Sequence, residues 1–222
     1  ATTAYPVQLI QRRAFNPNGT GMWFSAINAL LNQITMLTII LTGAALLRER
    51  EHGTIEHLLV MPLNAFQIVI AKIWSNGLII LVAFALSMLV MVEQTLDIPI
   101  AGSKLLLLLG TASYLFAAAA IGIFLGTIAQ TMAQFALLVL MVIIPMVMLS
   151  GGLTPIESQP DIIQPITWLL PSRHFMDFSQ AVVFRGAGFD LVWPQLTIII
   201  ALGAVFFIAS LAMFRRSLER MT

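Results

Sequence analysis

The 222-residue chain contains no cysteine, which excludes disulfide scaffolds, thiol nucleophiles and thiolate metal sites. Charged residues are also scarce, at 9% of the chain, whereas a typical soluble domain carries about 25%. Hydrophobic residues make up 59%, and so few charged side chains cannot cover the surface of a soluble protein of this size. Lipid must therefore cover much of the surface, which predicts an integral membrane protein.

The chain has no excess of either charge, because 11 basic residues balance 10 acidic ones and leave a net charge of +1. It therefore lacks the basic surface that nucleic-acid-binding proteins need, and no nucleic-acid partner is expected. A Gly-x-x-x-x-Gly-Lys-Ser/Thr motif is missing as well, so the chain has no P-loop for ATP phosphates. We expect no cofactor to be bound by the chain itself.

Four long stretches contain no Asp, Glu, Lys or Arg: 14–47, 73–92, 105–156 and 191–214. A helix that crosses the ~30 Å hydrocarbon core needs about 20 apolar residues. Three stretches fit one crossing each, and the longest fits two, with a turn at the polar residues 129–134. This pattern predicts an all-α integral membrane protein with five transmembrane helices. Their expected bounds are 23–47, 71–92, 104–128, 133–150 and 192–214.

An odd number of crossings places the two termini on opposite sides of the membrane. Basic residues are almost equally frequent on the two sides, but four of them directly follow the ends of spans: Arg48, Arg50, Arg215 and Arg216. Since basic residues near span ends favour the cytoplasm, we expect an extracytoplasmic N-terminus and a cytoplasmic C-terminus.

The segment between the first two spans, 48–64, holds the most informative pattern. Residues 48–51 alternate in charge, as at a helix that leaves the membrane. Gly53 can end that helix, and Thr54 can cap a short one that Pro62 stops. The apolar side chains of the short helix share one face: Ile55, Leu58 and Leu59. So brief a helix needs a surface to lie on, either the lipid interface or a groove of a partner protein.

His52, Glu56 and His57 only loosely resemble a metal-protease motif, because the spacing differs by one residue from those of zinc proteases. The two histidines would point about 140° apart on a helix. We therefore expect no metal site, and a membrane-embedded enzyme built on these residues is a third hypothesis, after the two given below.

Polar and small residues inside the spans indicate helix contacts. Asn28, Asn32 and Thr35 share one face of the first span, and lipid would not satisfy them. They either form hydrogen bonds between helices or line a transport pathway or dimer seam. Ala118, Gly122 and Gly126 form a row of small residues on the third span, which predicts close helix packing.

The stretch 48–63, Arg-Glu-Arg-Glu-His-Gly-Thr-Ile-Glu-His-Leu-Leu-Val-Met-Pro-Leu, resembles a signature of the permease subunit of ATP-binding cassette (ABC) type-2 exporters. Residues 149–160, Leu-Ser-Gly-Gly-Leu-Thr-Pro-Ile-Glu-Ser-Gln-Pro, are similar to that family's segment after its fifth span. Such permeases usually have six spans and an extracytoplasmic domain after the first. The resemblance therefore implies the C-terminal portion of a larger permease, which lacks the first span and most of the external domain. Three parts are expected: the end of the external domain (1–22), the transmembrane domain (23–214) and a cytoplasmic tail (215–222).

The resemblance also implies how the chain would work. A short cytoplasmic coupling helix within 48–64 would dock on a separate ATPase subunit, which binds ATP and magnesium. The residues assigned to this coupling are Glu49, Arg50, Glu51, His52, Gly53, Thr54, Ile55, Glu56, Leu58 and Leu59. Gln130 and Gln134 would form a second, smaller cytoplasmic contact, and 151–190 would re-enter the membrane from outside as short helices. The pathway candidates are Asn28, Asn32, Thr35, Phe135 and Met141, although a methionine at such a position is more often ordinary apolar core.

As a whole, the resemblance implies the pore subunit of an ATP-driven exporter in the bacterial inner membrane. This subunit would not itself be an enzyme, and the exporter would move amphiphilic or drug-like substrates. The expected partners are the ABC ATPase, a second permease copy of the same or a different kind, the lipid bilayer and a periplasmic adaptor. The alternative is an ion-coupled secondary transporter or channel. The lack of any charged residue in the middle of a span counts against it, because such proteins use buried carboxylates.

Overall fold

The computed structural model describes residues 21–51, 64–152 and 156–219, and within these ranges it contains helices and no strand. Five of the described helices are long and apolar enough to cross a membrane. They are α1 (Gly21–Glu51), α3 (Ala65–Ser87) with its continuation η1 (Met88–Thr95), α4 (Lys104–Ile128), α5 (Met132–Leu149) and α8 (Phe189–Glu219). The prediction of an all-α membrane protein with five membrane-spanning helices is confirmed.

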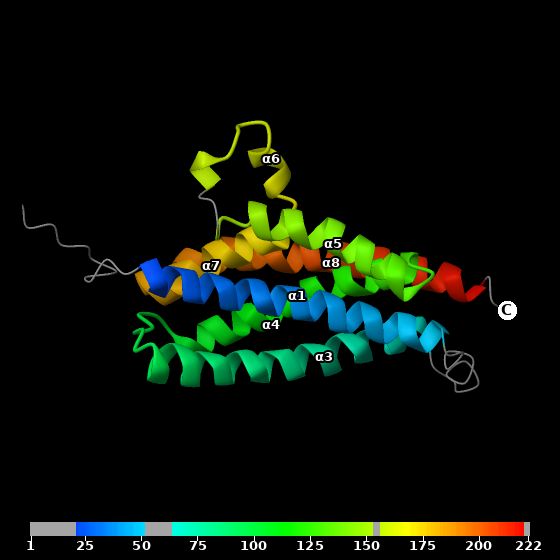
Figure 1. Cartoon of the computed structure of the whole chain (residues 1–222), viewed down its shortest axis with the longest axis horizontal. Coiled ribbons are helices and arrows are strands. Elements are labelled where there is room, and N and C mark those ends of the chain that lie inside the picture. Colours follow the sequence, from blue (N-terminus) through cyan, green and yellow to red (C-terminus); the bar gives the residue numbers. More distant parts are fainter. Residues whose placement is uncertain (1–20, 52–63, 153–155, 220–222) are drawn as a thin grey trace, which may run out of the picture.

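The five helices lie side by side along the long axis of the molecule, with α1, α4 and α8 running one way and α3 and α5 the other (Figure 1). One end of the bundle, called here the Arg50 end, holds the end of α1, the start of α3, the α4–α5 turn and the end of α8. The opposite end, called the α7 end, holds the starts of α1, α4 and α8 (Figure 1).

Helix α4 is the centre of the bundle, because it contacts α1, α3, α5, α7 and α8. Its middle consists of four alanines, Ala117–Ala120, whose side chains are all fully buried. Such small side chains allow other helices to approach α4 closely from several directions. Ser210 of α8 is one of the closely packed residues, and its Oγ donates a hydrogen bond of 2.8 Å to the Ala120 carbonyl.

Glycines bring α1 and α4 into backbone contact, as the small-residue row predicts. A Cβ atom on Gly126 would lie 2.6 Å from the carbonyl oxygen of Gly43, and one on Gly122 would lie 2.5 Å from that of Ile39. Ala118, the third member of the row, is fully buried. The predicted role of this row in close helix packing is therefore confirmed, and α1 is the partner of Gly122 and Gly126.

The observed helix bounds differ most from expectation in the second span. Helix α3 begins at Ala65 instead of 71, because Asn64 and Gln67 form a capping box. It then continues through the π-helix η1 to Thr95, past the expected end at 92. The charge-free run begins only after Lys72, and that residue lies inside the helix, where it forms an ion pair with Glu49 of α1.

Between α5 and α8 the chain forms three short helices: η2 (Ile156–Ser158), α6 (Gln164–Thr167) and α7 (Pro171–Arg185). Helix α6 projects from the bundle, whereas α7 lies along it (Figure 1). Helix α7 packs against α4 and α8, and most of its side chains are buried. It ends at Gly186, whose φ of 64° is left-handed and suits a residue without a side chain. Residues 151–190 thus supply short helices, while their entry from the outside stays a prediction.

Candidate functional site

At the Arg50 end, α1 finishes in three charged residues that each bond to a different helix. Glu49 forms an ion pair with Lys72 of α3. Arg50 donates hydrogen bonds to the end of α4, and Glu51 accepts one from the start of α5. These three residues were assigned to ATPase coupling, and each of them bonds to a neighbouring helix of the same chain.

Arg50 lies against the last turn of α4. Its Nη1 is 3.2 Å from the Gly126 carbonyl oxygen, 2.9 Å from that of Thr127 and 3.3 Å from that of Ala129. The final carbonyls of a helix have no partner within the helix, and they form the negative end of its dipole. A half-buried guanidinium at this position therefore satisfies polar groups and neutralises partial charge at the same time.

Glu51 lies against the first turn of α5. Its Oε1 accepts a hydrogen bond of 3.0 Å from the backbone N–H of Met132, the first residue of that helix. The first N–H groups of a helix lack internal acceptors and form the positive end of its dipole, which favours a carboxylate there. Arg50 and Glu51 thus match their charges to the two helix ends that flank the α4–α5 turn.

The α4–α5 turn also carries Gln130 and Gln134, the predicted second cytoplasmic contact. Gln134 Oε1 accepts a hydrogen bond of 2.8 Å from the Gln130 N–H, and Thr131 Oγ1 accepts one of 3.2 Å from the Gln134 N–H. The side chains of Gln130, Thr131 and Gln134 are all exposed. The structure therefore joins this turn to the charged end of α1, although whether the turn contacts an ATPase stays a prediction.

The rest of the predicted coupling segment, residues 52–63, lies outside the described residues. It holds His52, Gly53, Thr54, Ile55, Glu56, Leu58 and Leu59, and also His57 of the metal-site hypothesis. Their assigned roles stay predictions.

Two of the pathway candidates on α1 point into the chain. Asn28 Nδ2 donates a hydrogen bond of 2.9 Å to the Gly152 carbonyl, and its Oδ1 accepts one of 3.1 Å from Gln180 of α7. Thr35 Oγ1 lies 2.8 Å from the Tyr114 hydroxyl of α4. Both side chains are buried and match the expectation of hydrogen bonds between segments of one chain.

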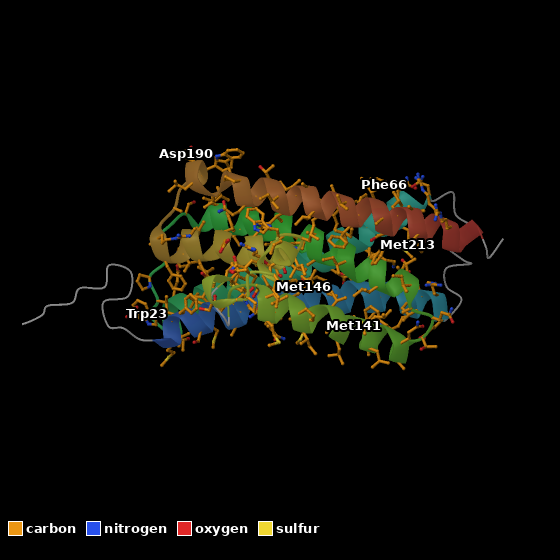
Figure 2. The ribbon with its side chains drawn as sticks, turned by 90° about the horizontal axis from the view of Figure 1, so that it is seen from above. Trp23, Phe66, Met141, Met146, Asp190 and Met213 are labelled. Atoms are coloured by element: carbon orange, nitrogen blue, oxygen red, sulfur yellow. The ribbon has the colours of Figure 1, made fainter. Side chains whose placement is uncertain are left out.

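The other pathway candidates occupy different environments. Asn32 is half-buried, and Phe135 is buried against the α1 backbone, where its ring would meet a Cβ atom on Gly43 at 2.5 Å. Met141 is 75% exposed at the outer edge of the bundle, whereas Met146 on the same helix is 1% exposed and lies among the helices (Figure 2). Asn32 and Met141 are therefore the candidates that remain accessible from outside this chain.

Sequence reasoning did not single out Tyr114, Gln180 or Gly152, which complete the interior polar contacts. The Tyr114 ring stacks on that of Phe175, with 4.0 Å between the centroids. A signal for Tyr114 was present, because a tyrosine in an apolar span needs a partner for its hydroxyl and Thr35 lies in a facing span. No signal in the sequence pairs Asn28 with Gln180, since they are 152 residues apart.

The chain is similar to known proteins over nearly its whole length. The model of the ABC-2 family transporter protein matches residues 1–212. The chain is 52% identical over 215 residues to the inner membrane transport permease YhhJ of Escherichia coli strain K12, covering 97% of this chain and 58% of that protein. It is 33% identical over 210 residues to the probable multidrug ABC transporter permease YbhR of the same strain, covering 94% of this chain and 56% of YbhR.

A more distant relative is ABC transporter G family member 20 of Dictyostelium discoideum, which is 23% identical over 215 residues, or 95% of this chain and 29% of that protein. The chain thus spans less than two thirds of the length of these relatives. The family predicted from residues 48–63 and 149–160 is confirmed by the family match. Because that match covers nearly all of the sequence, the chain belongs to the ABC-2 family of ABC transporter membrane proteins.

Proposed function

We propose that the chain is the transmembrane core of a permease subunit of an ATP-driven exporter in the bacterial inner membrane. A separate ABC ATPase subunit binds ATP and magnesium and docks on residues 48–64. The substrate is an amphiphilic or drug-like molecule that leaves the cytoplasm or the inner leaflet. Support comes from the family and from relatives that are named inner membrane and probable multidrug permeases.

The observation that carries this proposal is the distribution of charge along the described spans. Every Asp, Glu, Lys or Arg of α1, α3–η1, α4, α5 and α8 lies within about two turns of a helix end. A transporter driven by protons or sodium ions uses ionisable groups inside the membrane. The energy for transport must then enter from outside the bundle, as it does when a partner hydrolyses ATP.

The energy source can be tested in inverted membrane vesicles that contain the complete permease and its ATPase. We expect ATP-dependent uptake of an amphiphilic dye that continues after an ionophore collapses the proton and sodium gradients. A non-hydrolysable ATP analogue should reduce uptake to the level of vesicles without the permease. Uptake driven by an imposed ion gradient in the absence of ATP would instead support the ion-coupled alternative.

The partner of the exposed α1–α5 face is a second permease copy. Gln33 and Leu37 are exposed on α1. Met141 and Met148 are exposed on α5, which is one of the helices that α1 contacts. An exposed glutamine within a span is poorly satisfied by lipid, so a protein partner or water suits this face better. Met141 and Met148 also provide adaptable apolar surface for a varied substrate.

Single-cysteine crosslinking tests this dimer, because the chain has no cysteine of its own. We expect Met141→Cys to form a covalent dimer on mild oxidation in membranes, since residues near a two-fold axis face their own copies. Ile208→Cys is the matched control, because Ile208 is a similarly exposed apolar residue on α8. A dimer through position 208 and none through 141 would contradict the proposed face.

A further inference from the structure

Arg50 and Glu51 add long-range bonds to an α4–α5 turn that also makes local bonds of its own. Thr131 already caps α5 through the Gln134 N–H, and the Gln134 side chain binds the Gln130 N–H. Helix α5 therefore has an N-cap from its own turn, and Glu51 adds an acceptor for the Met132 N–H, which that cap does not reach. The bond from Glu51 comes from 81 residues away in the sequence, and the Arg50 bonds come from 76 to 79 residues away.

These long-range bonds connect two segments that otherwise belong to different parts of the chain. One is the end of α1, which finishes at Glu51, and the other is the turn between α4 and α5, which carries Gln130 and Gln134. Arg50 bonds to the negative end of the α4 dipole, and Glu51 bonds to the positive end of the α5 dipole. The arrangement adds polar bonds that resist separation of the end of α1 from both α4 and α5.

We propose that Arg50 and Glu51 are positioning residues that join the end of α1 and the α4–α5 turn into one mechanical unit. This inference rests on the proposed function, in which an ATPase pushes on the segment after α1. Through Arg50 that displacement reaches the end of α4, and through Glu51 it reaches the start of α5. In the proposed exporter α5 carries Met141 on its accessible face, so the connection relays movement at the ATPase to the pathway.

The experiment uses the complete permease with its ATPase in lipid nanodiscs and compares Arg50→Ala and Glu51→Ala with Arg50→Lys and Glu51→Gln. Lysine keeps a charged donor, and glutamine keeps the acceptor oxygen, so each conservative variant should restore part of the effect. Spin labels at Arg48→Cys and Gln130→Cys, both exposed positions, report the distance between the two segments. Dye transported per ATP hydrolysed reports the coupling.

We expect a narrow distance distribution in the wild type and a broad one in both alanine variants, with partial recovery in the lysine and glutamine variants. Transport per ATP hydrolysed by the bound ATPase should fall at least about fivefold in the alanine variants. A merely structural role would lower the amount of folded complex and would not change this ratio.

Three other results are informative. An unchanged distance distribution in the alanine variants would overturn the inference. Loss of ATPase binding in Arg50→Ala with a narrow distribution would also overturn it, and would make Arg50 a direct ATPase contact. If the distances broaden as expected but the wild-type complex shows no ATP-dependent transport, the connection between the segments stands and the proposed function fails.

Discussion

Replacing Tyr114 with alanine is expected to lower the free energy of unfolding of the permease strongly. The ring is fully buried in the centre of α4 and stacks on Phe175 of α7. Removing it leaves a cavity between α1, α4 and α7 and costs about 3–5 kcal/mol of folding free energy, as for other buried aromatic residues. Thermal unfolding of the purified permease in mild detergent should show a clearly lowered midpoint and a reduced yield of folded protein.

Tyr114→Phe is the matched control, because it keeps the ring and removes only the hydroxyl. Thr35 loses its 2.8 Å bond to that hydroxyl but keeps its bond to the Leu31 carbonyl. Hydrogen bonds between membrane helices average about 0.6 kcal/mol, so this variant should unfold close to the wild type. If phenylalanine were as damaging as alanine, the hydroxyl pair and not the stacked ring would hold α1, α4 and α7 together.

Gly126→Ala is expected to weaken the contact between α1 and α4 by about 1–3 kcal/mol, which is typical of overpacking. The added Cβ would lie 2.6 Å from the Gly43 carbonyl oxygen, so the two backbones must separate. That movement also shifts the Gly126 carbonyl that accepts a bond from Arg50. We expect a lower unfolding midpoint in detergent and less folded protein in membranes.

Gly77→Ala is the control for this substitution, because it adds the same methyl group to another membrane helix. A Cβ atom on Gly77 of α3 would meet no atom within 4 Å. The higher helix propensity of alanine should leave this variant as stable as the wild type or slightly more stable. Equal losses of stability in the two variants would show that the close contact at Gly126 does not limit packing.

The sequence predicts the helices of this protein well and their contacts poorly. Charge-free runs mark where lipid can cover the chain, and this explains why five spans could be located. The start of α3 was placed too late because the run begins after Lys72, although the capping residues Asn64 and Gln67 were visible in the sequence. The π-helix η1 carries no sequence signal that separates it from an α-helix.

The candidate site shows a similar division. The charged end of α1 could be recognised as important from residues 48–51, but the partners of Glu49, Arg50 and Glu51 depend on how three other helices are arranged. Likewise, helical spacing groups Asn28, Asn32 and Thr35 on one face without showing which part of it is covered. The structure buries Asn28 and Thr35 and leaves Asn32 only half-buried, because α4 and α7 cover part of the face.

The glycine contact between α1 and α4 restricts how the permease can change shape. Sliding these helices would bring Cα atoms and carbonyl oxygens against each other, and parting them would take the Tyr114 hydroxyl away from Thr35. In the proposed exporter the two helices are therefore expected to move as one rigid body. A pathway in the proposed exporter would then open between this pair and other elements, which include the second copy of the proposed dimer.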